Sequence, residues 1–187
     1  HFVFRFEEPP GDVEPGENYR IGDTDLASRL SFFLWATAPD DELLAVARQG
    51  KLSNPTVLES QVRRMLADPR SDALGPRFAA QWLRLQDLEK IHPDVRKNPD
   101  FHDQLKESML RETELFFISL VNEDRSVLEL FTADYTFIDE RLAKHYGIPD
   151  VTGTHFRRVT YPDDTRRGLL GHGSILTLTS HAGRTSP

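Results

Sequence analysis

Residues 100–122, DFHDQLKESMLRETELFFISLVN, form the longest segment of the chain with a regular hydrophobic period. Its large apolar side chains recur every four or seven positions, a spacing that gathers them on or near one face of an α-helix. They are Phe101, Leu105, Met109, Phe116 and Leu120. The segment therefore predicts a long helix with one face turned towards a core.

Shorter helices are predicted on the N-terminal side of this segment. Asp23 or Thr24 begins a helix that Pro39 ends, residues 40–49 form a second helix closed by Gly50, and Ser53-Asn54-Pro55 is a strong start for a third. The expected apolar stripes are Leu26, Leu30, Phe33 and Leu34 in the first helix, and Leu58, Val62 and Leu66 in the third. Residues 72–88 read as another helix around Phe78, Trp82 and Leu85, with a kink or a delayed start at Gly75-Pro76.

Three more helices are predicted after residue 122, at 126–131, 138–145 and 167–179, and residues 155–161 read as a short strand or hairpin arm. The expected fold is all-α, a bundle-like domain of about seven to eight helices with one short β or irregular excursion near 150–165. We expect residues 1–8 to end a preceding module, 9–18 to be a linker, 19–165 to form the main helical domain and 166–187 to start a following module.

Composition excludes several classes of function. The 187 residues contain no cysteine, which excludes disulfides, thiol catalysis, thiolate metal sites and covalent attachment of haem c within this chain. The net charge of −7 gives no basic footprint for nucleic acid. No apolar run approaches the ~20 residues of a membrane span.

The segment RRGLLGHGSILTLTSHAGRTSP, residues 166–187, invites a reading as a binding loop. It has no lysine for a phosphate loop, lacks the third glycine of a dinucleotide fingerprint, and places Ser174 directly after a glycine, unlike a hydrolase elbow. The simpler interpretation is that the glycines allow a helix to pack closely on a neighbour. Its core-facing residues are then Leu169, Leu170, Ile175, Leu176 and Leu178.

The seven histidines show no metal-ligand spacing, so we predict no metal site. Ligation in trans of a haem held elsewhere remains a hypothesis for His145, His172 and His181. Among the acidic residues of the long helix, which are Glu107, Glu112 and Glu114, we expect structural roles, with Glu107 and Arg111 as an i,i+4 surface pair.

The stretch ADYTFIDERLAKHYGIP, residues 133–149, has two interpretations. In the structural one, an anchor of Tyr135, Phe137, Leu142 and Tyr146 holds a short helix whose positive N-terminus is matched by Asp139. In the functional one, a catalytic or substrate-binding site for an extracellular polymer combines this stretch with the polar residues at 177–186. The candidate residues of that site are Asp134, Arg141, His145 and Arg184.

Several phrases in this order resemble a known family: YRIGDTDLASRLSFFLWATAPDDELL, VRRMLADPR, FAAQWLRL, RETELFF and FTADYTFIDERLAKHYGIP. They are similar to the domain-of-unknown-function family numbered 1592, found in very large proteins of planctomycetes and related bacteria. HFVFRFEE at the start resembles the end of family 1595, and residues 166–187 resemble the opening of family 1588. No activity comes with this resemblance.

What the resemblance implies is a context. Such modules occur in exported multidomain proteins that also carry c-type cytochrome modules, so the expected location is periplasmic or extracellular. The expected partners are neighbouring domains of the same polypeptide, including a cytochrome domain, with any haem c in another part of the parent. The leading hypothesis is a scaffold or docking surface for that redox domain.

Overall fold

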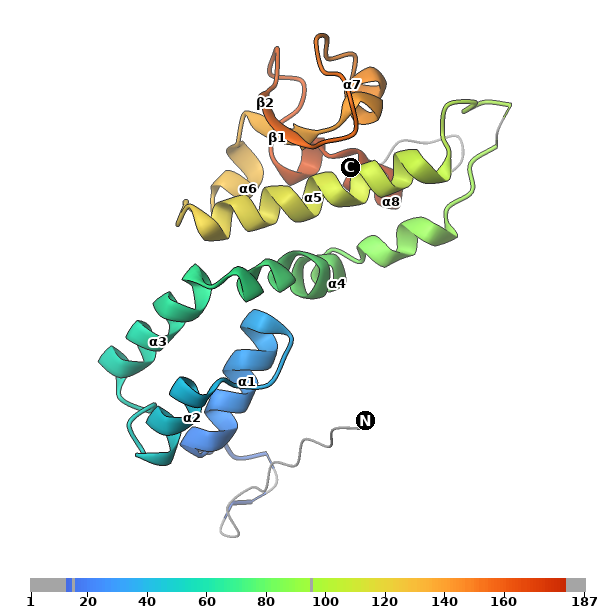
Figure 1. Cartoon of the computed structure of the whole chain (residues 1–187). Helices are drawn as coiled ribbons and strands as arrows, with labels where there is room; N and C mark the ends of the chain where they lie inside the picture. Colours follow the sequence, from blue (N-terminus) through green and yellow to red (C-terminus); the bar gives the residue numbers. More distant parts are fainter. Residues whose placement is uncertain (1–12, 15, 95, 181–187) are drawn as a thin grey trace. The chain divides into compact units, whose positions relative to one another are not determined.

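The computed structural model describes residues 13, 14, 16–94 and 96–180 (Figure 1). The chain forms two compact units, the first ending at Ser71 and the second beginning at Asp72. The sequence-based boundaries at residues 8, 18 and 165 remain predictions.

The first unit contains α1 (Asp23–Trp35), α2 (Asp41–Arg48) and α3 (Pro55–Ala67). Two of the helix starts have side-chain caps: Asp40 accepts from the Leu43 amide at 3.0 Å, and Asn54 accepts from the Thr56 amide at 3.0 Å. The predicted capping of α1 by Asp23 or Thr24 was wrong, since Gly22 is the N-cap. The Asp23 carboxylate instead accepts from the Leu52 amide at 2.7 Å and so holds the turn before α3.

The buried faces of α1 and α3 lie about one position away from the predicted apolar stripes. In α1 the buried residues are Ala27, Ser31, Leu34 and Trp35, whereas Phe33 is 52% exposed. In α3 they are Gln61 and Met65, and the predicted stripe residues Leu58, Val62 and Leu66 are only partly buried. The apolar side chains of each helix occupy adjacent positions, so their spacing fits two neighbouring faces, and contacts between the helices select one.

An aromatic and ionic cluster joins the ends of these helices. The Trp35 indole donates to the Met65 carbonyl at 2.8 Å, and the Arg70 guanidinium lies 3.5 Å from the Trp35 ring centre. Arg64 makes two hydrogen bonds to Asp40, at 2.8 and 3.0 Å. These contacts lower the pKa of Asp40 to about 2, the Arg64 hydrogen bonds being the main cause.

The second unit begins with a helical path that changes pitch several times. It consists of η1 (Pro69–Ala73, which starts in the first unit), the π-turn η2 (Gly75–Ala79), α4 (Ala80–Trp82) and η3 (Leu85–Lys90). The irregularity expected at Gly75-Pro76 is present as the π-turn, although the single helix predicted for 72–88 is broken. Phe78 and Trp82 are not core residues, being 37% and 53% exposed, and they form a ring cluster with Phe117.

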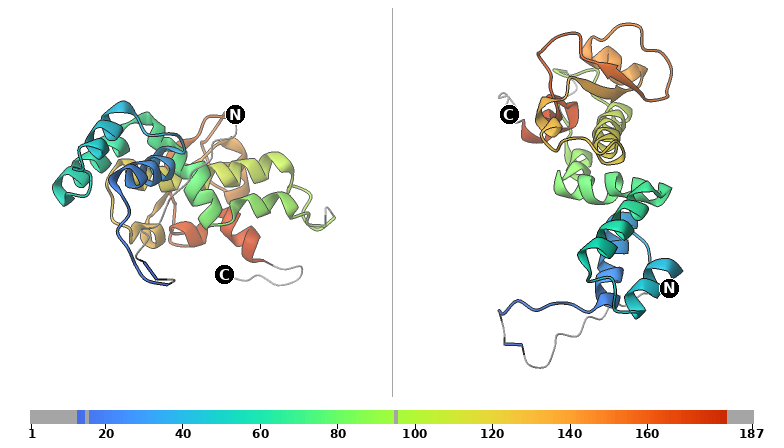
Figure 2. Two further views of the ribbon diagram at one scale, coloured as in Figure 1. Left: turned by 90° about the horizontal axis from the view of Figure 1, so that it is seen from below. Right: turned by 90° about the vertical axis from the view of Figure 1, so that its left-hand side faces the viewer.

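The predicted long helix is confirmed as α5 (Asp103–Asn122), the central element of the second unit. Figures 1 and 2 show a small sheet and α7 (Glu140–Tyr146) over α5, with α8 (Gly173–Thr179) beside it. One half of α5 packs in a cluster around Phe116 and the other in a cluster around Met109. The Phe116 cluster consists of Phe116, Leu120, Leu130, Ala133, Tyr135 and Leu169. The Met109 cluster consists of Leu105, Met109, Ile138, Leu142 and Ala143.

The small sheet pairs β1 (Tyr135–Ile138) with β2 (Arg157–Thr160) in antiparallel register, with Tyr135 opposite Thr160. The strand predicted within 155–161 is confirmed. Its partner was missed because the short run at 135–138 has no alternation that separates a strand from the start of a helix. The predicted fold, mostly helical with one small β excursion, is confirmed.

The last part of the described chain is less regular than predicted. η4 (Leu169–Gly171) and α8 are separated by His172, whose ψ of 138° is extended, so no single helix runs over 167–179. Leu169 is buried as expected, but Leu170 is 58% exposed. The element α6 (Glu129–Thr132) lies against η4. None of the helices in the described residues is both long and apolar enough to cross a membrane.

Candidate functional site

A carboxyl group lies in the middle of the second unit. Glu112 is fully buried at the centre of α5, where its two oxygens accept hydrogen bonds from the Thr136 hydroxyl and the Tyr146 hydroxyl, each at 2.6 Å. The Tyr146 hydroxyl in turn accepts from the Gly173 amide at 2.6 Å. One side chain of α5 is thereby connected to β1, α7 and α8.

A second set of polar groups continues from the next residue of α5. The Thr113 hydroxyl lies 2.9 Å from Nδ1 of His172 and 2.7 Å from the Ser174 hydroxyl, and all three residues are buried. The His172 ring meets Phe116 edge to face, with ring centres 4.9 Å apart. We call these residues the Glu112 cluster: Glu112, Thr113, Thr136, Tyr146, His172 and Ser174.

The environment of the cluster changes the proton affinity of its members. Burial raises the pKa of Glu112 to about 7, and the two hydroxyl donors and the charge of Arg166 offset part of that effect. Burial, aided by Arg166, lowers the pKa of His172 to about 3, so its imidazole is neutral. Arg166 itself lies 4.0 Å from the Tyr146 ring centre and donates to the Gly171 carbonyl at 2.6 Å.

The cluster is a proton-binding group sealed inside the protein. A carboxyl with a pKa near neutrality is typical of acid–base sites, but neither Glu112 nor His172 has any exposed surface that a substrate or an external haem could reach. Among the described residues, buried side-chain atoms without a hydrogen-bond partner are Nε2 of His172, the Tyr161 hydroxyl and Nε of Arg157. The geometry assigns the cluster to holding four elements together.

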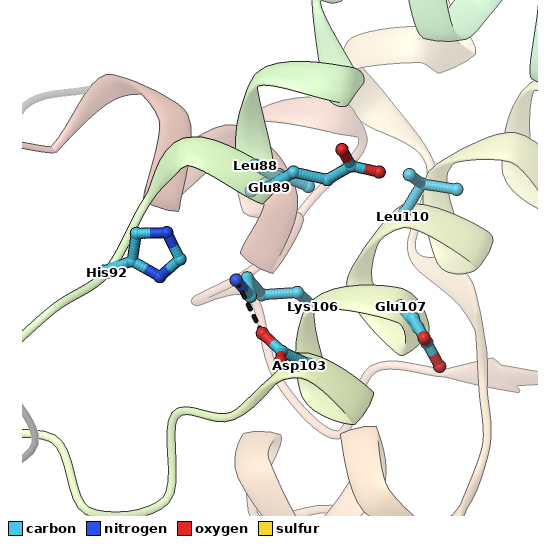
Figure 3. Close-up of a pocket in the computed structure, with 7 residues that line it drawn as sticks. All are labelled: Leu88, Glu89, His92, Asp103, Lys106, Glu107 and Leu110. Atoms are coloured by element: carbon cyan, nitrogen blue, oxygen red, sulfur yellow. Dashed lines mark ion pairs between the residues drawn. The ribbon is translucent and has the colours of Figure 1, made fainter.

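Two surface features of the second unit are open to other molecules. The first is a pocket of about 400 Å³ between η3 and the start of α5, lined by Leu88, Glu89, His92, Asp103, Lys106, Glu107 and Leu110 (Figure 3). The second is a group of exposed apolar side chains on and around α6, which we call the α6 patch. Its members are Val127, Leu128, Phe131 and Leu170.

The residues proposed for a polar catalytic site have separate surroundings. Asp134 is exposed and its carbonyl accepts from the Tyr161 amide at 2.7 Å. Arg141 contacts the Asp139 carboxylate at 3.5 Å and the Ser108 hydroxyl at 3.2 Å, and His145 lies at the surface beside Tyr146. Part of the His145 ring is covered, which lowers its pKa. No described contact joins Asp134 to Arg141 or His145.

The other candidate residues, His172, His181 and Arg184, lie in different parts of the chain. His181 and Arg184 lie outside the described residues. His172, proposed as a ligand for an external haem, is instead in the core next to Phe116. The described part of the chain has no group of three or more His, Asp or Glu side chains that could hold a metal ion.

The cap of α7 agrees with the sequence-based prediction, whereas the ion pair of Arg111 on α5 differs from it. Asp139 caps α7 by accepting from the Leu142 amide at 2.9 Å, as the structural interpretation of 133–149 predicted. The surface pair of Arg111 is different from the expected one, because Arg111 binds Glu114 at 3.0 Å in place of Glu107.

From the sequence we expected a structural role for Glu112, but we did not predict that its side chain is buried. A signal for that burial was present: Glu112 lies three residues after Met109 and four before Phe116, on the apolar stripe of the helix. A charged residue on such a stripe is expected to have partners in the core. The position of His172 between Gly171 and Gly173 carried no comparable signal.

Comparison with known proteins finds one family. The family model described as "PSD4: Protein of unknown function (DUF1592)" matches residues 21–148. No curated protein and no solved structure matches the chain.

Proposed function

Since the chain belongs to the PSD4 family of proteins of unknown function (DUF1592), we propose that it is a docking module for a c-type cytochrome domain within a larger polypeptide. In this proposal the haem c is bound in another part of the parent, because this chain has no cysteine to attach it. The parent is exported to the periplasm or the cell exterior, and the neighbouring domains of the same polypeptide are the partners.

The observation that carries the proposal is the α6 patch. Val127 and Leu128 are 69% and 68% exposed, Phe131 is 55% exposed and Leu170 is 58% exposed. A contiguous group of large apolar side chains on a protein surface marks a place where another protein binds. In a module of a multidomain protein, the nearest candidate to cover it is a neighbouring domain.

The patch is held on a fixed backbone, as a docking surface requires. The Gly168 amide donates to the Ala133 carbonyl at 3.0 Å, which holds the chain before η4 against the end of α6. A Cβ on Gly168 would lie 2.3 Å from the Leu130 carbonyl oxygen, so only glycine allows this approach. Phe131 and Leu170 are thereby kept on neighbouring elements.

The redox part of the proposal is tested with the purified parent protein. We expect its visible absorption spectrum, recorded oxidised and after reduction with dithionite, to contain the Soret and α bands of a c-type haem. A featureless spectrum would remove the cytochrome from the proposal.

The docking part is tested by hydrogen exchange measured on the parent and on the 187-residue chain. We expect the backbone amides of 127–132 to exchange more slowly in the parent, because a docked domain covers the α6 patch. The substitutions Leu128→Gln and Phe131→Gln should together restore the faster exchange. The amides of α3, in the first unit, serve as the internal reference. Equal exchange of 127–132 in both proteins would refute docking at this patch.

A further inference from the structure

The pocket between η3 and α5 is formed by elements other than those of the α6 patch. Leu88 and Glu89 come from η3, His92 from the segment after it, and the remaining four lining residues from the first two turns of α5. Figure 3 shows Glu89 extending towards Leu110, while Lys106 and Asp103 are paired at the other end, near His92. The pocket thus has two chemically different ends.

The charges at the Lys106 end are already satisfied. The Lys106 ammonium contacts the Asp103 carboxylate at 2.8 Å and the Ile91 carbonyl at 3.4 Å, and its residue is only 9% exposed. This pair is neutral as a whole. Lys106 is therefore not available as the main partner of an anionic ligand.

The carboxylates of Glu89 and Glu107 are not satisfied. Neither has an ion pair or a hydrogen bond within the part of the chain that the structure describes, although the five other side chains around the pocket include a lysine and a histidine. Both glutamates are exposed at the rim. The pocket therefore has two unpaired negative charges, in a chain whose net charge is −7.

The interior next to these carboxylates is apolar. Leu88 is almost completely buried, at 1% exposed, whereas Leu110 is only partly buried, so Leu110 presents the accessible apolar surface beside Glu89. A ligand that matches both parts has an aliphatic stem and a positively charged head. Among protein side chains, lysine and arginine have this form, since their methylene groups cover apolar surface while the charge remains near water and carboxylates.

We propose that this pocket receives a lysine or arginine side chain of a partner protein, with the stem against Leu110 and the charge beside Glu89, while Glu107 adds negative charge at the same rim. A free alkylamine gains only solvent-screened ion pairing there, whereas a side chain carried by a docked segment adds the contacts of its neighbours. Because the α6 patch contributes no residue to the pocket, the two proposals can fail independently.

The test is a titration of the ¹⁵N-labelled 187-residue chain with an eight-residue peptide that has a single central lysine. We expect amide shifts to change at residues 88–92 and 103–110. A peptide with norleucine at the central position keeps the stem and lacks the charge, so it should bind at least about fivefold more weakly. The double variant Glu89→Gln/Glu107→Gln should weaken the lysine peptide by a similar factor.

Matched controls separate this pocket from general electrostatic attraction. The variant Asp41→Asn/Glu59→Gln removes the same charge from exposed positions of the first unit and should bind the peptide as the wild type does. Equal binding of lysine and norleucine peptides, or unchanged binding by Glu89→Gln/Glu107→Gln, would overturn the proposal. n-Butylamine binding as tightly as the peptide would also overturn it, since the pocket would then be a small-amine site.

Discussion

Glu112 is an ionisable side chain placed where charge is costly. Its carboxyl is fully buried, and the hydrogen bonds from Thr136 and Tyr146 only partly offset the loss of water, so its pKa rises to about 7. In an unfolded chain the pKa of a glutamate carboxyl is near its ordinary value of 4.5. The proton is therefore bound more tightly in the folded protein.

The raised pKa of Glu112 makes the stability of the second unit depend on pH in one direction. The stabilising contribution of Glu112 is fully present below pH 4.5 and is lost as the pH rises through about 7. The substitution Glu112→Gln removes the titration. We expect the stability of the variant relative to wild type to increase between pH 5 and pH 8 by an amount on the order of 2–3 kcal/mol. Urea unfolding at the two pH values measures this change.

Wild type and Glu112→Gln are compared because His172 changes the stability with pH in the opposite direction to Glu112. Its pKa is lowered to about 3, so its contribution is present above pH 6.5 and is lost as the pH falls towards 3. That effect is common to wild type and Glu112→Gln and cancels in the difference. The exposed Glu107→Gln is the control and should follow the wild-type pH dependence. A difference independent of pH would show that Glu112 does not titrate in this range.

At the scale of elements, α5 and α8 approach closely at a glycine. A Cβ on Gly173 would lie 2.9 Å from the Tyr146 hydroxyl and 3.0 Å from Cε of Met109. The same residue donates its amide to Tyr146 and so supports the hydroxyl that binds Glu112. Gly173 thus allows α8 to pack closely on its neighbours, as predicted for the glycines of this segment.

The substitution Gly173→Ala is expected to destabilise the second unit by about 1–3 kcal/mol, because the added methyl group forces Tyr146 or Met109 to move. Thermal or urea unfolding monitored by circular dichroism measures the loss. The control Gly22→Ala places its Cβ no closer than 3.8 Å to any atom beyond its chain neighbours, so we expect only the small loss, below about 1 kcal/mol, of a poorer N-cap for α1. Equal stability of Gly173→Ala and wild type would contradict the close packing.

At the scale of the whole molecule, the chain forms two compact units with one tryptophan in each, Trp35 in the first and Trp82 in the second. Trp35 lies in the cluster of Asp40, Arg64 and Arg70. The Asp40 carboxylate has its pKa lowered to about 2, so its contribution is present above pH 3.8 and is lost as the pH falls through 2.

In a Trp82→Phe background, Trp35 fluorescence reports on the first unit alone. We expect Asp40→Asn to lower the free energy of unfolding of the first unit by about 1 kcal/mol at pH 7, after allowance for solvent screening of the ion pair, so its urea transition moves to a lower concentration. Asparagine keeps the capping of α2, so the shift reports the lost charge. Glu112→Gln should leave this transition unchanged. If both variants shift the Trp35 signal equally, the two units unfold as one.

Features that depend on neighbouring residues could be predicted from the amino-acid sequence alone. The period of residues 100–122 predicted α5, Asn54 and Asp139 were recognisable at helix starts, and the absence of cysteine excluded thiol chemistry. These features rest on local spacing and on the chemistry of single side chains. Family membership also followed from the order of short motifs.

Which side chains are buried and which remain exposed depends on contacts between elements that lie far apart in the sequence. The contacts of Glu112 with Thr136 and Tyr146 join residues 24 and 34 positions apart, and the pairing of β1 with β2 joins segments about 20 residues apart. The exposure of the α6 patch and the unpaired glutamates of the pocket likewise follow from packing. Hydrophobic period and capping signals describe one element at a time, whereas burial is set by the elements that pack against it.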